Sequence, residues 1–503
     1  MKAPFKILYS NDLTHIECCV SPYRRRGETF RGEMLNASVY ETAGLGIDVH
    51  ILQPGMGWVP LWQSKSLPPE KHWEWTQKTY HVEKPNGYIQ YLLDGGDIVA
   101  DFTKCCREKQ LMPFISLRMN DNHHLDKIKQ TMADYTQLSF CKFYYDHPEY
   151  RLETATSSFR DRGQNWAVPA VREYKFNFIR ELCENYDIDG IELDFMRAPY
   201  LFRSFETTSE QREEIMTEFI ARVRRLLDET ATEGRRWLCV KLPIDCCLLD
   251  SIGMNVSRLA DTGVDMFNWS YSYYTAQDGD LAFIRRLAPQ AAMYVEMTSC
   301  SSLGRAVDRA PGDNYEFMKT STEQFYTTAE SIYDAGMDGV SLFNFVYYRE
   351  HGSAGKRGAV GEPPFEIIHN LRDREFLSRQ NHCYFIGSHW QDDGPLPKAM
   401  MLLGQYVNFM LQNVVLANGT TQALLKVHIN NPEAGNWEAW FNDHPVFKAK
   451  DSSVSGTSID GKVLIWDIPL EFLVTGDNNI EFRSEDIVLS VIDYIELTIR
   501  RKK

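Results

Sequence analysis

Two carboxylates, Glu192 and Asp194, lie one residue apart in the segment "YDIDGIELDFMR" (186–197), among mostly apolar neighbours. Burying a carboxylate in a protein core is costly unless the group is paired or put to chemical use. Side chains alternate across a strand, so Ile191 and Leu193 occupy one face and the two acids occupy the other. We therefore expect both acids to point into the interior of a closed sheet, with Asp194 nearer the rim where such sheets place their chemistry.

Four further segments repeat this alternation between apolar and polar side chains. In each segment the apolar residues share one parity and the polar residues the other, which predicts that five strands aim polar groups into one cavity. The polar sets are Asp48 and His50 in "IDVHILQ"; Ser116, Arg118 and Asn120 in "FISLRMND"; Lys241 and Asp245 in "CVKLPID"; and Tyr294, Glu296 and Thr298 in "AMYVEMT".

Two carboxylates at the rim of such a cavity indicate cleavage of a glycosidic bond. One acid protonates the leaving oxygen, and the other attacks the anomeric carbon or activates water. We predict that Asp194, as nucleophile, and Glu296, as acid/base, form this catalytic pair. The runner-up acids are Glu192 and Asp245. Neighbouring basic side chains would separate the pKa values of the two catalytic acids.

Polar and aromatic side chains near the same rim are expected to hold the sugar. Flat rings stack on the apolar faces of sugar rings, while charged and amide groups bind the hydroxyls. The predicted substrate-binding residues are Arg118, Asn120, Lys241, Trp269, Tyr271, Trp58 and His50.

Structural roles compete with these assignments. Buried charges are usually paired, so Glu192 could form an ion pair with Lys241 inside the sheet. For the same reason Asp245 could pair with Arg118 or Lys241. Aromatic residues also dominate cores, and packing is expected to claim about half of the rings.

Short apolar segments alternate with helical patterns up to about residue 380, which is typical of a parallel sheet. Thr208 or Ser209 is expected to begin one long helix and Gly234 to end it. No Gly-rich nucleotide turn follows the first strand, so residues 1–375 are predicted to form a (β/α)8 TIM barrel, not a doubly wound sheet. The predicted strands are 6–12, 47–55, 111–121, 189–197, 237–245, 264–274, 292–299 and 338–348, and the predicted helices include 168–186, 209–234 and 321–337.

The pattern changes near residue 381, where short strand-like runs are separated by Asn, Gly, Asp and Pro. Residues 381–503 are predicted to form an all-β sandwich domain. Trp437 and Trp440 lie three residues apart on one of its strands, so they face opposite sides and at most one can be a sugar platform. Bracing of the barrel or an oligomer contact is the expected role of this domain.

The charge balance excludes several classes of partner. With 54 basic and 69 acidic residues the net charge is −15, so neither a nucleic acid nor an anionic membrane surface is expected. The apolar runs are too interrupted to span a membrane. The N-terminal "MKAPFKILYSND" shows no signal-peptide pattern, so either the location is cytoplasmic or a signal segment has been removed. The 11 cysteines without C-x-x-C spacing indicate reduced thiols and favour the cytoplasm.

Metal and cofactor motifs are not found in the sequence. The adjacent His123 and His124 lack the spacing of metal ligands and are expected to have a loop or sugar-contact role. The chain is therefore expected to need no metal and no cofactor. A metal-dependent barrel enzyme is an alternative hypothesis, for which Asp121, Asp194 and Asp245 would supply the acids.

The block "NWAVPAVREYKFNFIRELCENYDIDGIELDFMR" (165–197) resembles a segment of bacterial glycosyl-hydrolase-like barrel proteins, often called family-10-like glycosidases. The resemblance implies a TIM barrel, carbohydrate substrates and catalytic acids at strand ends, and it marks Asp194 more strongly than Glu192. Glu296 matches the strand-seven position of a nucleophilic Glu in the largest retaining clan. That clan places Asn-Glu at strand four, where this chain has Leu193 and Asp194. A non-catalytic carbohydrate-binding barrel is the second hypothesis.

Overall fold

The fold is described from a computed structural model of residues 1–503. The structure describes all residues except 1, 26, 124, 126–136, 138, 154–161, 233, 272–273, 303–316, 344, 350–361, 388–399, 402–405, 417–418, 430–436, 455–460, 485–489 and 503.

Eight parallel strands form a closed barrel, which confirms the predicted fold class. Their order around the barrel is β1-β10-β7-β6-β5-β4-β3-β2. All eight predicted strands are present, each shorter than its prediction; residues 345–348 of the last predicted strand, for example, form the short helix η5 (Phe345–Tyr348). Their bounds are β1 Ile7–Asp12, β2 Val49–Gln53, β3 Met112–Arg118, β4 Gly190–Asp194, β5 Trp237–Pro243, β6 Met266–Ser270, β7 Ala292–Thr298 and β10 Gly339–Phe343.

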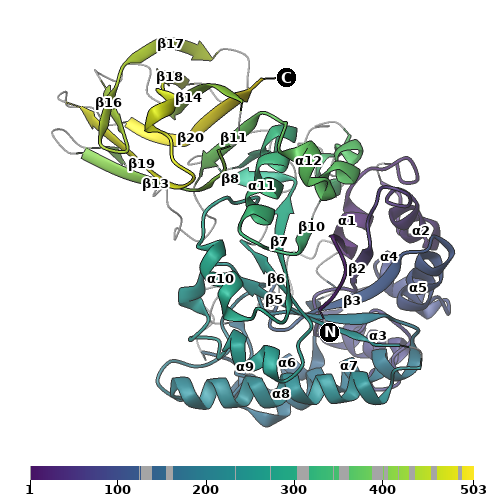
Figure 1. The fold of residues 1–503 in the computed structure, drawn as a ribbon. Coiled ribbons are helices and arrows are strands. Elements are labelled where there is room, and N and C mark those ends of the chain that lie inside the picture. Colours follow the sequence, from purple (N-terminus) through teal and green to yellow (C-terminus); the bar gives the residue numbers. More distant parts are fainter. Residues whose placement is uncertain are drawn as a thin grey trace. The chain divides into compact units, whose positions relative to one another are not determined.

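Helices follow the barrel strands along the chain. Of these, α7 and α8 pack against each other and run side by side in Figure 1. Thr208 caps α8 in a capping box with Gln211, as predicted. The helix ends at Glu229, so the predicted stop at Gly234 is wrong; this glycine has a positive φ in the following loop. The helices are α1 Leu13–Cys18, α2 Gly32–Tyr40, α3 Pro69–Tyr80, α4 Gly87–Leu93, α5 Ile98–Glu108, α6 Lys142–Asp146, α7 Pro169–Asn185, α8 Ser209–Glu229, α9 Val256–Asp261, α10 Leu281–Leu287, α11 Thr322–Asp334 and α12 Arg374–Leu377.

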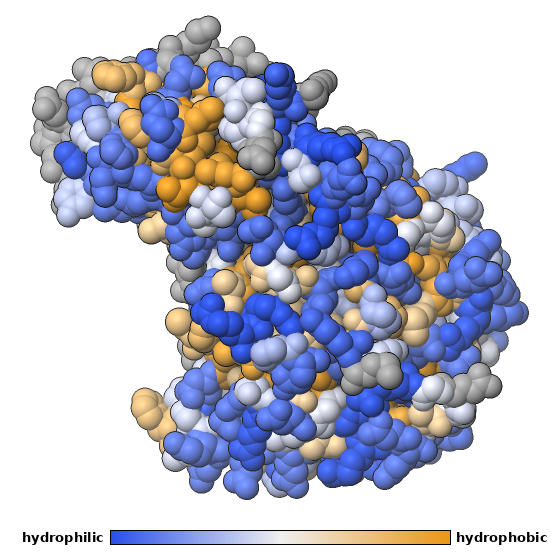
Figure 2. Space-filling model, viewed as in Figure 1, coloured by the Kyte–Doolittle hydropathy of each residue, from blue (hydrophilic) through white to orange (hydrophobic). Residues whose placement is uncertain are grey.

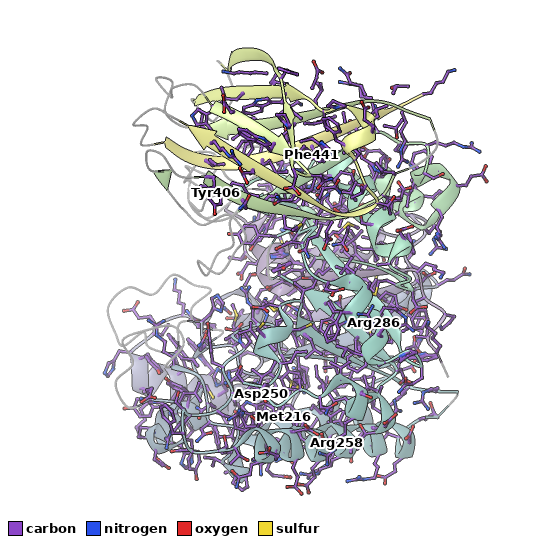
Figure 3. All side chains as sticks on the ribbon, turned by 60° about the vertical axis from the view of Figure 1, so that its left-hand side comes forward. Met216, Asp250, Arg258, Arg286, Tyr406 and Phe441 are labelled. Carbon is purple, nitrogen blue, oxygen red and sulfur yellow. The ribbon has the colours of Figure 1, made fainter. Side chains whose placement is uncertain are left out.

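Two ion pairs tie α8 to the segment that follows β5. Arg212 Nη2 lies 3.0 Å from Asp250 Oδ2, and Arg258 Nη1 lies 2.9 Å from Glu213 Oε1. Figure 3 labels Asp250 and Arg258 beside Met216 of this helix. The pairs are partly exposed, so each is expected to contribute at most about 1 kcal/mol, and the buried face of α8 supplies most of its stability.

An apolar layer closes the interior of the barrel below its polar residues. It is built from alternate residues of successive strands, such as Val49 and Ile51 of β2, together with Ala3 and Phe5, which precede β1. Because the strands alternate, the residues that continue this face toward the carboxyl ends are Gln53 on β2 and Asp194 on β4. The layer comprises Ala3, Phe5, Leu8, Val49, Ile51, Phe114, Trp237, Cys239, Met266, Ala292 and Tyr294.

The chain divides into two compact units. The first comprises Met1–Ser272 and Arg286–Tyr294, and the second comprises Tyr273–Arg285 and Val295–Lys503. The first unit contains β1 to β6, and the second contains β10 and the antiparallel sheets described next. The predicted domain boundaries, 1–375 and 381–503, remain a prediction.

Two antiparallel sheets with a shared core lie in the C-terminal region, as predicted (Figure 1). Phe441 is fully buried in this core, and Figure 3 shows it among the strands. Trp437 lies in the core, whereas Trp440 is partly exposed beneath the Arg483 guanidinium, so the two rings face opposite sides as predicted. One sheet has the order β11-β20-β14-β18-β17, with β12 beside β20, and the other has the order β13-β19-β15-β16. The bounds are β11 His382–Ile386, β12 Met400–Met401, β13 Tyr406–Val414, β14 Thr420–Ile429, β15 Trp437–Phe441, β16 His444–Val446, β17 Lys448–Val454, β18 Gly461–Asp467, β19 Gly476–Ser484 and β20 Ser490–Arg501; a separate pair is β8 Cys300–Ser302 and β9 Phe317–Lys319.

A cluster of buried polar side chains joins α11 to the first of these sheets. Glu330 of α11 pairs with His382 on β11, and its Oε2 lies 3.2 Å from Arg501 Nη1 on β20. His382 Nδ1 also lies 2.9 Å from the Tyr384 hydroxyl. Helix α11 and the sheet are therefore tied by charges that are shielded from water.

The surface of the second unit carries hydrophobic residues. Figure 2 shows an orange area over its antiparallel sheets. Exposed large hydrophobic side chains in this part of the chain are Tyr406, Met410, Phe447, Leu470 and Val474. Within the described part of the chain, no helix combines the length and the apolar character that a membrane crossing requires. The cysteines whose side chains are described are all free thiols.

Candidate active site

Four polar side chains meet where β1 to β4 end. Asp12, Gln53, Arg118 and Asp194 are the last residues of these four strands. Asp12 is the register partner of Gln53, and Arg118 is the register partner of Asp194. All four are at least 98% buried. Parallel strands therefore bring four polar groups from distant parts of the sequence to one edge of the sheet.

The Asp194 carboxylate is held by three N–H groups. Its Oδ1 accepts hydrogen bonds from the backbone N–H groups of Met196 (3.0 Å) and Arg197 (3.1 Å). Its Oδ2 accepts a bond of 3.2 Å from Gln53 Nε2. The side chain is 2% exposed. The predicted inward direction and rim position of Asp194 are confirmed by these contacts.

Arg118 is the cation at the centre of the cluster. Its guanidinium pairs with Asp12, and its Nη1 lies 2.8 Å from Asp121 Oδ2. Its Nε and Nη2 donate to Gln53 Oε1 at 3.1 and 3.0 Å. Burial opposes its charge, but Asp12 and Asp121 outweigh this and raise the pKa of Arg118. Through these contacts the guanidinium of Arg118 holds the side chains of Asp12, Gln53 and Asp121 in place.

The loop after β3 completes the charged cluster. Asp121 Oδ1 lies 2.5 Å from His123 Nδ1, and Arg197 Nη2 lies 3.4 Å from His123 Nε2. Burial raises the pKa of Asp121, but His123, Arg118 and Arg197 together hold it well below its ordinary value. Burial, followed by the charge of Arg118, lowers the pKa of Arg197 to about 10. The cluster therefore joins the carboxylate of Asp121 to three basic side chains, Arg118, His123 and Arg197.

Glu192 lies one layer deeper than Asp194. Its carboxylate accepts bonds from Ser116 Oγ (2.8 Å), Asn268 Nδ2 (3.0 Å) and Cys239 Sγ (3.6 Å). Burial raises the pKa of Glu192, and the charge of Lys241 opposes that rise. Its hydrogen-bonded position inside the barrel fits a structural role better than the role of a rim acid.

A buried lysine holds the loop after β2 against the end of β3. Lys175 of α7 donates to the carbonyls of Gly57 and Arg118, the latter at 2.8 Å. A Cβ at Gly57 would lie 2.1 Å from the Arg118 carbonyl oxygen, and its φ is +81°, so only glycine fits this approach. Trp58 is 1% exposed and lies under Lys175 Nζ at 3.8 Å. The prediction that Trp58 stacks on a sugar is wrong, because both packing and its bond to the Asp121 carbonyl bury it.

His50 points away from the barrel interior, so its predicted inward direction is wrong. Its ring contacts Tyr9 and Phe102 of α5, and its Nδ1 lies 3.4 Å from Thr42 Oγ1. The face of β2 that points inward carries Val49, Ile51 and Gln53 instead. Polar character alone misassigned the parity of this strand, because the interior begins with an apolar layer.

Trp269 is also turned away from the predicted sugar site. It is fully buried, and its Nε1 lies 3.2 Å from Met293 Sδ. Its neighbour Asn268 contacts Glu192 inside the barrel, so alternation places Trp269 on the helix side. Tyr271 follows β6 and is partly exposed. Its predicted contact with substrate remains a prediction.

Asn120 and Asp245 have local structural roles. Asn120 Nδ2 donates to the carbonyls of Gln164 (3.0 Å) and Tyr200 (2.6 Å), and Oδ1 accepts from Gln164 N–H (3.0 Å). Its amide therefore joins two loops and is occupied by protein groups. Asp245 is partly exposed and caps the short helix η4 (Cys246–Leu248) through a bond of 2.9 Å from Cys247 N–H. The predicted pairing of Asp245 with Arg118 is wrong, because Asp12 and Asp121 occupy that cation.

Glu296 and Lys241 are buried on the strands predicted for them. Glu296 is 2% exposed on β7, and Lys241 is 2% exposed on β5, where it is the register partner of Asp194. Their roles, and the pairing of Glu296 with Asp194, remain predictions.

Among the described residues, no group of three or more His, Cys, Asp or Glu side chains could hold a metal ion. Asp121 is bound by Arg118 and His123, and Asp245 caps a helix, so the three acids of the metal-dependent alternative have separate tasks. His124 lies outside the described residues.

Asp12 and Gln53 are two residues of this site that the sequence-based predictions do not include. Asp12 ends a strand segment of mixed polarity, "ILYSND", which gives no clear parity. Gln53 lies on the opposite parity from His50, which the sequence predicts to point inward. Its signal was its place, four residues after Val49 and just before Pro54, which ends the strand on the face of the apolar layer.

No protein-family model matches the chain, and no curated protein matches it. Solved structures of similar fold include the PgaB (BpsB) glycoside hydrolase domain from Bordetella bronchiseptica, at 11% identity and a TM-score of 0.44 over 74% of this chain and 99% of that one. Another is a GH138 enzyme targeting pectin rhamnogalacturonan II, at 10% identity and a TM-score of 0.42 over 74% of this chain and 48% of that one. Human YKL-39, a pseudo-chitinase with retained chitooligosaccharide binding, is 10% identical, with a TM-score of 0.40 over 73% of this chain and 99% of that one.

These structural neighbours are glycoside hydrolases and a pseudo-enzyme. The chain spans 48% of the GH138 enzyme and 57% of a second neighbour, a Paenibacillus glucanotransferase. At these identities and TM-scores, the likenesses assign no reaction to this chain.

Proposed function

We propose that this chain is a glycoside hydrolase that cleaves an oligo- or polysaccharide at the carboxyl ends of its barrel strands. The observation that carries the proposal is the buried Asp194 carboxylate, held by three N–H groups where β4 ends. Fixed donors keep this group in one orientation before substrate binds, as a nucleophile requires. Acids at this end of a barrel strand are the usual carriers of chemistry in such folds.

In the proposed reaction, Asp194 attacks the anomeric carbon while Glu296 donates its proton to the leaving oxygen. The glycosidic bond breaks, and a glycosyl ester forms on Asp194. Glu296, now ionised, takes a proton from water, whose oxygen attacks the same carbon and releases Asp194. Glu296 shares the strand face of Tyr294, which packs in the apolar layer of the barrel interior, and this parity supports its participation.

Hydrolysis of a panel of aryl glycosides and polysaccharides tests the proposal. Asp194→Asn should lower kcat by about a thousandfold or more on any substrate that the native chain cleaves. The matched control is Asp265→Asn, a buried carboxylate before the first residue of β6 that binds Arg224 and Arg235. The control should lose melting temperature and keep its kcat. Native-like turnover by Asp194→Asn would refute the assignment.

Two further variants separate the roles of the acids. Azide should restore turnover to Asp194→Ala and yield a glycosyl azide, because the small anion takes the place of the missing nucleophile. Glu296→Ala should lose far less activity on substrates with very acidic leaving groups, which need no protonation. The reverse pattern would exchange the two roles. NMR of the first-formed anomer then reports retention or inversion.

A non-catalytic carbohydrate-binding barrel is the second candidate. It is favoured by the bonds that already hold Asp194, whose Oδ1 accepts two hydrogen bonds from protein groups and whose Oδ2 accepts one. Calorimetric titration with oligosaccharides distinguishes the two functions: tight binding without product over days supports a binding protein, and slow product formation supports the enzyme.

A further inference from the structure

We infer that Gln53 is a positioning residue, which Arg118 orients so that its amide holds the Asp194 carboxylate in place. This inference rests on the proposed function for its kinetic consequence. Gln53 is fully buried at the end of β2. It stands between the central cation of the cluster and the acid that carries the proposed chemistry.

The hydrogen bonds fix the direction of the amide. Arg118 Nε and Nη2 both donate to Gln53 Oε1, at 3.1 and 3.0 Å. A guanidinium has donors only, so the amide oxygen must turn toward Arg118. Its NH2 group is then left for two acceptors, Asp194 Oδ2 at 3.2 Å and Ser116 Oγ at 3.4 Å.

The same bonds continue to the deeper acid. Ser116 Oγ donates to Glu192 Oε1 at 2.8 Å, so its hydroxyl proton is committed away from Gln53. A chain of bonds with one direction therefore runs from Arg118 through Gln53 and Ser116 to Glu192, with a branch to Asp194. Reversal of the Gln53 amide would set donor against donor at Arg118 and acceptor against acceptor at Asp194.

Glutamine is the residue that this position requires. The side chain must accept from Arg118 and donate to Asp194 at the same reach. A glutamate would satisfy Arg118 but set a second carboxylate against Asp194. A methionine has the same length and neither a strong donor nor a strong acceptor. These two replacements separate charge from positioning.

The other charges near Asp194 are unchanged by a substitution at Gln53. Arg118 at the end of β3, Arg197 in the loop after β4 and Glu192 on β4 are electrostatically coupled to Asp194. Lys241 on β5 is its register partner. A change in Asp194 titration on substitution of Gln53 alone therefore reports the Gln53 contact.

The test compares Gln53→Glu and Gln53→Met with the native chain. Gln53→Glu should move the acidic limb of the kcat/KM profile upward by about one pH unit, because a nearby like charge disfavours the ionised carboxylate. Gln53→Met should lower kcat by about 10- to 100-fold, with KM changed by less than about threefold, because the nucleophile is less well placed. The matched control is Gln211→Glu, which adds the same charge in the capping box of α8 and should leave the profile unchanged.

A titration without substrate keeps the inference separate from the proposed function. The carboxyl carbon of Asp194, assigned by its loss in Asp194→Asn, is followed by 13C NMR across pH in the native chain and in Gln53→Glu. A midpoint about one pH unit higher in the variant supports the Gln53 contact even if no glycoside is cleaved. Equal midpoints in the native chain, Gln53→Glu and Gln211→Glu overturn the inference, even if hydrolysis by Asp194 is established.

Discussion

Arg118 Nη1 lies 2.8 Å from Asp121 Oδ2, three residues further along the chain, and both side chains are buried. The same guanidinium pairs with Asp12 from β1. One cation therefore compensates two carboxylates, of which one lies on β1 and the other in the loop directly after β3. The stability of this end of the barrel depends on that cation.

Arg118→Met should destabilise the protein by about 3–5 kcal/mol, because it leaves two buried carboxylates without their counter-charge. Urea unfolding measures the loss. The control is Arg258→Met, which removes a half-exposed partner of Glu213 and should cost about 1 kcal/mol or less. Equal losses in the two variants would contradict the central role of Arg118.

The cluster should also make the protein sensitive to acid. Because the pKa of Asp121 is well below its ordinary value of 3.8 in the folded chain, the folded state binds fewer protons than the unfolded state in this range. The stabilisation is present above pH 3.8 and is lost as pH falls toward the folded pKa. In urea unfolding between pH 2 and pH 5 (about the range over which such carboxylates titrate), Asp121→Asn should show a shallower decline than the native chain. Parallel declines would argue against it.

His50 should add a second acid dependence at milder pH. Burial lowers the pKa of His50 from 6.5 to about 3, so between these values the unfolded state holds a proton that the folded state lacks. Stability should therefore fall as pH falls from 6.5 toward 3. His50→Gln should remove this slope. The substitution should also leave KM unchanged, because the ring faces Phe102 and Thr42. A raised KM would indicate that His50 contacts the substrate.

The buried amine of Lys175 should make the stability of the protein depend on pH from neutral to alkaline conditions. Burial lowers its pKa from 10.5 to about 7, so between these values the folded state has lost a proton that the unfolded state keeps. Stability should rise with pH across this window, relative to a Lys175→Met variant that lacks the group. The difference in melting temperature between the two chains, measured from pH 6 to pH 10 (about the span of the transition), gives the result. A constant difference would contradict the lowered pKa of Lys175, because it would mean that the amine keeps its proton in the folded chain.

Periodicity predicted the barrel because each strand is a short apolar run followed by a helical pattern. Those signals are local, so the eight strands, α7, α8 and α11 follow from sequence alone. The predicted ends of the strands were less accurate, because Asn120 and Asp245 continue the sequence alternation of β3 and β5 but lie in loops. Parity succeeded where apolar neighbours were unambiguous, as around Asp194.

Parity failed where polar residues also face helices. His50 and Trp269 fit the expected composition of a sugar site. On each of their strands, however, a residue of the other parity points inward: Gln53 on β2 and Asn268 on β6. The contact between Gln53 and Asp194 joins residues 141 positions apart and depends on the register of β2 against β3 and β4. Register is set by the packing of whole strands, which no single segment encodes.

The buried group of Glu330, His382 and Arg501 limits how evolution can recombine this chain. Truncation of the chain after residue 380 would remove both ionic partners of Glu330 and leave its carboxylate on α11 without a counter-charge. The sheets therefore cannot be removed or exchanged at no cost unless Glu330 on α11 changes as well.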